Sequence, residues 1–259
     1  MDTLLNLQIT QMASAYIFIV ILLFIVKLRG IPREKEIFIA SMRMTLQLVL
    51  TGYVLVYIFE NNHPIFTVII IGIMEGFAVH NIFNRVKVSL SSKIKKIIAL
   101  SMILGTISSL LYFILVVVHL SPWYDARYFI PIAGMLIGNS MTGISLGVSR
   151  LVEGMHKQKH LLESALMLGA TPKMASKEIV DTAFDAAILP TINSMIGMGI
   201  IFLPGMMTGQ ILSGESPIIA IEYQIAIMLG ILGSVTLTVL LFLHLGYKTF
   251  FNNQQQLNI

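Results

Sequence analysis

The sequence predicts an all-α integral membrane protein, with about seven membrane-spanning helices in a single transmembrane domain over residues 1–259. Hydrophobic residues make up 56% of the chain and charged residues only 12%, about half the charged fraction of an ordinary soluble domain. Long apolar stretches recur, and in lipid they are expected to form helices, which satisfy their own backbone hydrogen bonds. The chain has no cysteine, which excludes disulfides, thiolate metal sites and cysteine nucleophiles.

Seven apolar segments, each bounded by polar residues, are expected to cross the membrane. They are Gln8–Val26, Ile37–Phe59, Pro64–Asn81, Ile97–Leu120, Ile130–Ser149, Ala187–Leu212 and Glu222–Gly246. The first is too long for the core of a cleaved signal peptide, and MDTLLNLQ before it carries an acid and no base, so we expect it to be retained. Pro204-Gly205 is expected to kink or break the sixth segment and so free backbone carbonyls.

Basic residues predict the orientation of these helices. Of the 17 Lys and Arg residues, 15 fall in the first, third and fifth connections or the C-terminal tail. Arg127 alone falls on the opposite side, and Arg43 lies inside the second segment. The positive-inside rule then places the N-terminus outside and the C-terminus in the cytosol. The same pattern explains the net charge of +4 without a nucleic-acid partner.

The fifth connection, residues 150–186, is long, charged and helix-forming. Gly169 suits a helix C-terminus, and Thr171-Pro172 suits an N-cap followed by proline at the first helical position. Two helices are therefore expected to meet at a tight turn, with an apolar ridge of Leu161, Leu162, Leu166 and Leu168. Such a hairpin either lies on the membrane face or docks as a knob in a groove of a soluble partner.

Polar groups inside the apolar segments need a reason, because a charge there costs about 2.5–3.5 kcal/mol. Glu75 lies about 16 Å into the third segment; it either holds a cation or a proton on a transport path, or is held by Arg43 or by a hydrogen bond. Polar and small residues of the fifth segment either join helices, within the chain or across a dimer, or line a path. Thioethers suit soft ions, but methionine also fills gaps in packing, so no metal is assigned. The candidate translocation residues are Glu75, Asn139, Asn193, Pro204, Gly205, Met206, Met207, Thr208 and Gln210.

Two sets of residues carry a family resemblance. Glu163-Ser164-Ala165, Gly169 and Leu189-Pro190 resemble the coupling-loop motif of ATP-binding-cassette (ABC) permeases, with Ser164 for the first Ala and a longer run before Leu-Pro. Most of the chain resembles the FetB-type permeases described as iron exporters, on four stretches: Arg43–Phe59, Pro131–Leu151, Leu161–Pro172 and Leu189–Gln224.

The resemblance implies a homodimeric permease of a bacterial inner membrane that exports iron, powered by a separately encoded cytosolic ABC ATPase. ATP and Mg²⁺ would bind that ATPase, and the chain itself lacks the phosphate-loop signature G-x-x-x-x-G-K-[ST]. The resemblance further implies the residues that contact the ATPase: Glu163, Ser164, Ala165, Leu168, Gly169, Ala170, Thr171 and Pro172. Related plant proteins linked to aluminium tolerance leave another metal or a small molecule open as cargo.

Two other function classes have sequence features against them. A retinal-binding seven-helix receptor needs a lysine in its last helix, and Glu222–Gly246 has none. An intramembrane serine protease is suggested by Gly138-Asn139-Ser140 and His244, but Met rather than Gly follows Ser140. The metalloprotease motif H-E-x-x-H is also absent.

Overall fold

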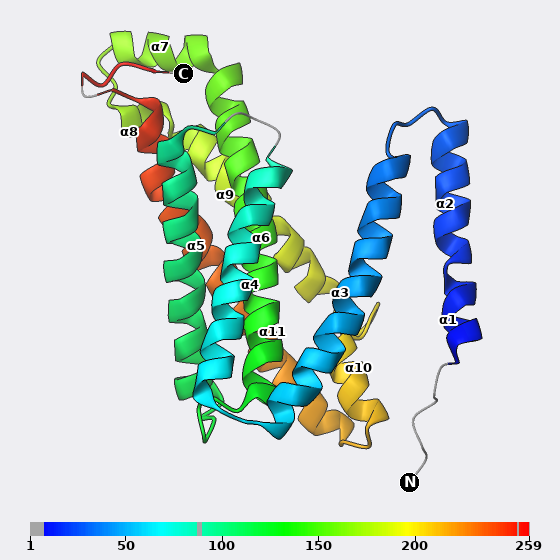
Figure 1. The fold of residues 1–259 in the computed structure, drawn as a ribbon. Helices are drawn as coiled ribbons and strands as arrows, with labels where there is room; N and C mark the ends of the chain where they lie inside the picture. Colours follow the sequence, from blue (N-terminus) through cyan, green and yellow to red (C-terminus); the bar gives the residue numbers. More distant parts are fainter. Residues whose placement is uncertain (1–7, 87–89, 253, 259) are drawn as a thin grey trace. The chain divides into compact units, whose positions relative to one another are not determined.

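A computed structural model describes residues 8–86, 90–252 and 254–258, and its regular elements are all helical (Figure 1). Within these ranges, seven helices are long and apolar enough to cross a membrane, which confirms the predicted fold class. Lys87, counted in the charge pattern, and most of the N-terminal MDTLLNLQ lie outside the described residues. The chain divides into two compact units, Met1–Asn62 and His63–Ile259.

The first unit is a helical hairpin. Its first span consists of α1 (Ile9–Ala15) and α2 (Ile17–Leu28), which meet at Tyr16, and its second span is α3 (Glu34–Glu60). The hydroxyl of Tyr16 shares a hydrogen bond with Thr45 of α3, so the interruption between α1 and α2 is tied to the neighbouring helix.

The second unit is a bundle of five spans. It contains α4 (Pro64–Arg85), α5 (Ser92–Tyr112) with a π-turn over Phe113–Val117, α6 (Ala126–Lys157), α9 (Lys177–Gly197) and α11 (Pro217–Gly246). Helix α11 packs against α5, α6 and α9, while α6 packs against α4 and α9. The helices begin where the sequence supplies caps, since the side chains of His63, Ser91 and Asp125 accept backbone N–H bonds of the first turns of α4, α5 and α6.

Glycines allow the closest helix contacts within this bundle. A Cβ on Gly105 of α5 would lie 2.4 Å from the hydroxyl of Thr238 on α11, and one on Gly143 of α6 would lie 2.7 Å from Val235 of α11. Small residues therefore bring α5, α6 and α11 together inside one chain, which is the within-chain form of the close packing predicted for the fifth segment.

The sixth segment differs from its predicted form as a single kinked helix over Ala187–Leu212. Helix α9 begins ten residues earlier, at Lys177, and ends at Gly197; a non-helical stretch follows, and α10 (Gly205–Leu212) starts after Pro204. The helix ends where it does because Gly199 has a φ of +83°, a conformation that continues no right-handed helix. Pro204 marks the start of α10 rather than the break itself.

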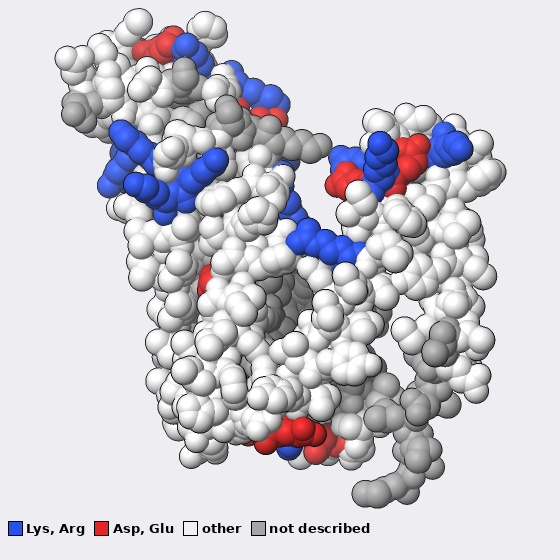
Figure 2. All heavy atoms as spheres, viewed as in Figure 1, with Lys and Arg blue, Asp and Glu red and all other residues white. Residues whose placement is uncertain are grey.

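The charges of the second unit are separated along the bundle. Lys and Arg side chains gather at the end that carries α7 (Lys159–Met167) and α8 (Pro172–Ala175), and acidic side chains gather at the other end (Figure 2). We call the first of these the basic end. Its composition agrees with the predicted orientation, in which the basic end faces the cytosol.

Candidate functional site

The turn between α7 and α8 has the backbone geometry predicted for it. Gly169 has a φ of +90°, its N–H donates to Leu166 O, and the N–H of Ala170 donates to Ala165 O, both at 3.0 Å. This pair of bonds is the Schellman arrangement that ends an α-helix on a glycine. The first helix of the predicted hairpin therefore stops at a fixed place.

The second helix of the hairpin starts at once. The hydroxyl of Thr171 accepts the N–H of Met174 at 3.3 Å, and Pro172 occupies the first helical position. At the far end of α8, the hydroxyl of buried Ser176 donates to Pro172 O at 2.7 Å. Both predicted signals, the glycine stop and the Thr-Pro start, are confirmed.

The tip of this hairpin is apolar and exposed. Met167 and Leu168 are 86% and 89% exposed, and Leu161 and Met174 are also exposed. We call these four side chains the apolar tip. The predicted leucine ridge is wrong in one member, because Leu162 is buried and anchors α7 to the core.

Glu163 lies on α7 beside two basic side chains. Its carboxylate is 3.8 Å from Lys159 Nζ and 4.0 Å from His160 Nδ1, and the hydroxyl of Ser164 donates back to His160 O at 2.8 Å. Exposed pairs of this kind contribute little to stability. The carboxylate remains accessible for a partner.

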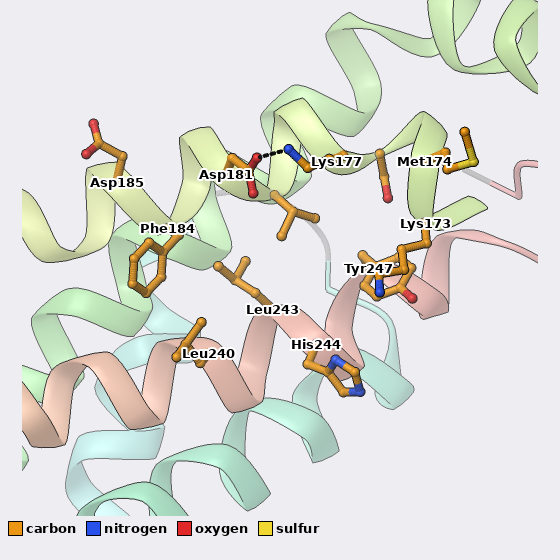
Figure 3. A pocket seen from close by; sticks show the side chains of 12 residues that line it. Lys173, Met174, Lys177, Asp181, Phe184, Asp185, Leu240, Leu243, His244 and Tyr247 are labelled. Carbon is orange, nitrogen blue, oxygen red and sulfur yellow. Dashed lines mark hydrogen bonds and ion pairs between the residues drawn. The ribbon is translucent and has the colours of Figure 1, made fainter. Parts of the chain in front are cut away.

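A pocket of about 730 Å³ opens directly behind α8, between α9 and the C-terminal half of α11 (Figure 3). Its rim carries the ion pair of Lys177 with Asp181, at 3.1 Å, and its walls are apolar, including Phe184 and Leu243. Because α8 supplies Lys173 to the same pocket, a displacement of α8 changes the space between two spanning helices.

Glu75 is buried inside the second unit, at 5% exposure. The hydroxyl of Thr106 on α5 donates to its Oε1, while its Oε2 has no hydrogen-bond partner in the described part of the chain. Of the alternatives open for Glu75, the structure shows a hydrogen bond, with one oxygen still available.

The fifth span, α6, does not assemble a protease site. Ser140 is fully buried and shares a 2.9 Å hydrogen bond with Ser234 of α11. His244 lies ten residues further along α11, about 15 Å away along the helix axis. A nucleophilic serine needs a base within hydrogen-bond reach, so Ser140 instead joins two helices.

Asn139 and Asn193 are both exposed side chains on spanning helices. Gly143 of α6 lies against Ala187 of α9, and the two helices run in opposite directions. One turn from this contact in each helix therefore brings Asn139 and Thr191 to one depth, with Asn193 close by. The two predicted amides thus lie at similar depth, while Nδ2 of Asn139 donates to Met135 O at 2.8 Å.

The break between α9 and α10 gathers the remaining predicted residues. The hydroxyl of Thr208 donates to Pro204 O at 3.0 Å, which occupies it in capping α10. Met207 is buried, Met206 packs partly buried against the core, and Gln210 is half-buried. The structure therefore favours packing for the two methionines of α10, as expected for such residues.

Gln224 of α11 is the residue that the search for candidate sites missed. It is 5% exposed, its Nε2 lies 3.8 Å from the sulfur of Met198 in the break, and its Oε1 has no partner among the described residues. An amide within an apolar run was the available signal, but its neighbour Met198 comes from another helix.

Comparison with known proteins identifies the family. The sequence matches the uncharacterised protein family UPF0014 over residues 9–251. The chain belongs to this family. It is 37% identical over 247 residues to the UPF0014 membrane protein YjkA of Bacillus subtilis, across 95% of this chain and 97% of the relative.

Two further relatives carry functional names. This UPF0014 chain is 31% identical over 252 residues to the probable iron export permease protein FetB of Escherichia coli, across 97% of this chain and 95% of the relative. It is 32% identical over 245 residues to the protein ALUMINUM SENSITIVE 3 of Arabidopsis thaliana, across 95% and 88%. The predicted resemblance to FetB-type proteins is confirmed. No solved structure matches the chain.

Proposed function

We propose that this chain is the membrane-spanning permease subunit of an ABC transporter that exports iron from the cytosol of a bacterium. It would work as a homodimer in the inner membrane, and a separate cytosolic ATPase would bind ATP and Mg²⁺ and supply the energy. The observation that carries the proposal is the apolar tip, fixed by two helix-ending devices and exposed at the basic end.

The connections of the tip suit a lever. A single residue, Gln158, separates α6 from α7, and Ser176 alone separates α8 from α9. Buried Leu162 and the Schellman turn hold the tip rigid. A partner that grips Leu168 and Met167 would therefore move two membrane-spanning helices directly, as a permease coupled to an ATPase requires.

Membrane physics supports the homodimer and the path. Asn139 and Asn193 are exposed on spanning helices, and polar side chains in a bilayer normally face protein or a water-filled cavity rather than lipid. A second copy of the chain across this face would cover both amides or enclose water between them. Iron as the cargo is supported by the relative named as a probable iron export permease.

The direct test uses inside-out vesicles that contain the chain and the ATPase encoded beside it. ATP is added with a mixture of metal ions, and the lumenal metal is measured by elemental mass spectrometry. Selective ATP-dependent accumulation of iron is the expected result. Stimulated ATPase activity without accumulation of any metal would keep the permease and reject the metal cargo.

Coupling has a matched pair of variants. Glu163 and Glu153 have similarly exposed side chains, 38% and 42%, and each faces a lysine four residues away. We expect Glu163→Lys to uncouple ATP hydrolysis from transport, and Glu153→Lys to leave coupling unchanged, because only Glu163 lies in the tip motif. Equal effects of the two reversals would remove Glu163 from the contact with the ATPase.

A further inference from the structure

The stretch between α9 and α10 places irregular backbone deep in the membrane-spanning region. Gly197 follows Asp185, the last charged residue before the break, by twelve residues, about 18 Å along the helix axis. Helix α9 thus ends part-way along the bundle, and α10 continues towards the end where α11 begins (Figure 1). Irregular backbone at such depth is tolerated only where protein buries it or a water-filled cavity adjoins it.

Several backbone groups of this stretch are unused. The N–H groups of Ile200 and Leu203 make no hydrogen bond within the described residues, and the carbonyls of Met198 and Ile201 accept none from the backbone there. Ile200 is also 93% exposed. The break therefore presents free carbonyl oxygens on one side.

Gln224 lies against the opposite side of the same stretch. Its amide nitrogen contacts the sulfur of Met198 at 3.8 Å, and its buried Oε1 lacks a donor in the described chain. A buried amide oxygen left without a partner costs about 1–3 kcal/mol. That cost is recovered if a cation or a donor binds there.

We propose that Met198 and Gln224 are the protein ligands of a binding site for a soft or borderline transition-metal cation at the α9–α10 break. The inference rests on the proposed export function and names the chemistry that selects its cargo. A thioether sulfur beside an amide oxygen favours transition metals over Mg²⁺ and Ca²⁺, which prefer all-oxygen ligands.

The site is electrically neutral, which suits transport. Neither ligand carries a charge, and α10 begins here with its positive dipole end, so electrostatics does not trap a cation. Selection then depends on the soft sulfur, and affinity stays moderate enough for release. Tight binding would oppose transport through the membrane.

Direct binding tests the proposal without the ATPase. The chain in lipid nanodiscs is dialysed against Fe²⁺ under anaerobic conditions, Mn²⁺ or Mg²⁺, and bound metal is measured by elemental mass spectrometry. We expect binding of Fe²⁺ and Mn²⁺ in preference to Mg²⁺. Met198→Leu and Gln224→Leu should each weaken Fe²⁺ binding on the order of 10-fold or more, while Met155→Leu, at a buried methionine near the basic end, should not.

A gain-of-affinity variant guards against misfolding of the leucine variants. Gln224→Glu keeps the size of the side chain and adds a carboxylate, so it should strengthen Mn²⁺ binding and raise Mg²⁺ binding. Absence of metal binding by the unsubstituted chain, or unchanged binding in Met198→Leu and Gln224→Glu, overturns the site.

The two proposals fail separately. Metal binding that depends on Met198 and Gln224, without ATP-driven accumulation in vesicles, would retain the site and reject the export function. Accumulation in vesicles with unaltered metal binding in the variants would retain export and reject the site.

Discussion

Replacing Gly169 by alanine tests whether the shape of the tip transmits force. Gly169 has a φ of +90°, and no atom lies within 4 Å of the place where a Cβ would stand. The substitution therefore adds backbone strain and no steric clash. The left-handed conformation costs a residue with a Cβ about 1–2 kcal/mol.

The chain supplies its own control in Gly214, at the end of α10. Gly214 has a φ of +98° and open space around its missing Cβ. Its N–H donates to Ile211 O at 3.0 Å and the N–H of Glu215 donates to Gln210 O at 3.1 Å, which is the same Schellman arrangement. Gly169→Ala and Gly214→Ala therefore impose the same local strain at opposite ends of the bundle.

The expected results differ in one assay only. Each variant should lower thermal stability by a similar amount. If the strained turn relaxes when free, docking must restore it, so Gly169→Ala should raise the ATPase concentration for half-maximal stimulation by up to about 5- to 30-fold. Gly214→Ala should leave this concentration unchanged, and Gly169→Asn should recover most of the loss, because Asn tolerates a positive φ.

Comparable losses of stimulation in Gly169→Ala and Gly214→Ala would refute the reasoning. The effect would then be a general consequence of lower stability and would say nothing about docking. Full stimulation in Gly169→Ala with a lowered melting temperature would show that the ATPase does not read the shape of this turn.

Three further predictions address the membrane region. Glu75→Gln keeps an acceptor for its threonine partner but removes the charge, so transport in vesicles should fall with little change in stability, and equal rates would return Glu75 to a structural role. Gly143→Ala should cost about 1–3 kcal/mol by overpacking against α11, whereas Gly138→Ala, with no atom within 4 Å, should leave the melting temperature unchanged; equal shifts would contradict the packing argument. Because the chain has no native cysteine, Asn193→Cys should give disulfide-linked dimers in membranes while Leu100→Cys on α5 should not, and monomers only in both would argue against the proposed dimer face.

Hydropathy and capping chemistry predicted most of the fold, because both act locally. The spans follow from the apolar runs, and the α7–α8 turn follows from Gly169 and Thr171, whose side-chain chemistry dictates their backbone role. Helix α9 was misplaced because its first residues are charged. Hydropathy ends at the membrane surface, whereas a helix can continue into water.

The break in the sixth span was hidden for a related reason. Ile200 and Ile201 prolong the apolar pattern, so hydropathy registers no change where the helix stops. Gly199 was the available signal, but a glycine inside a membrane helix is common and Pro204 is the more obvious helix breaker. The contact of Gln224 with Met198 depends on how α11 packs beside the break, which no local rule specifies.

Helix α9 connects the two proposed sites. It begins one residue after α8, next to the apolar tip, and runs for 21 residues to the break, a length of about 31 Å. A hydrogen-bonded helix of this length moves largely as a rod, so a displacement of the tip by a partner reaches Met198 at its other end. Because Gln224 belongs to α11, which is a different helix, such a displacement changes the distance between Met198 and Gln224. An ATPase acting at the tip could therefore open or close a metal site without contacting it, and the separation of the two ligands on two helices is what makes that coupling possible.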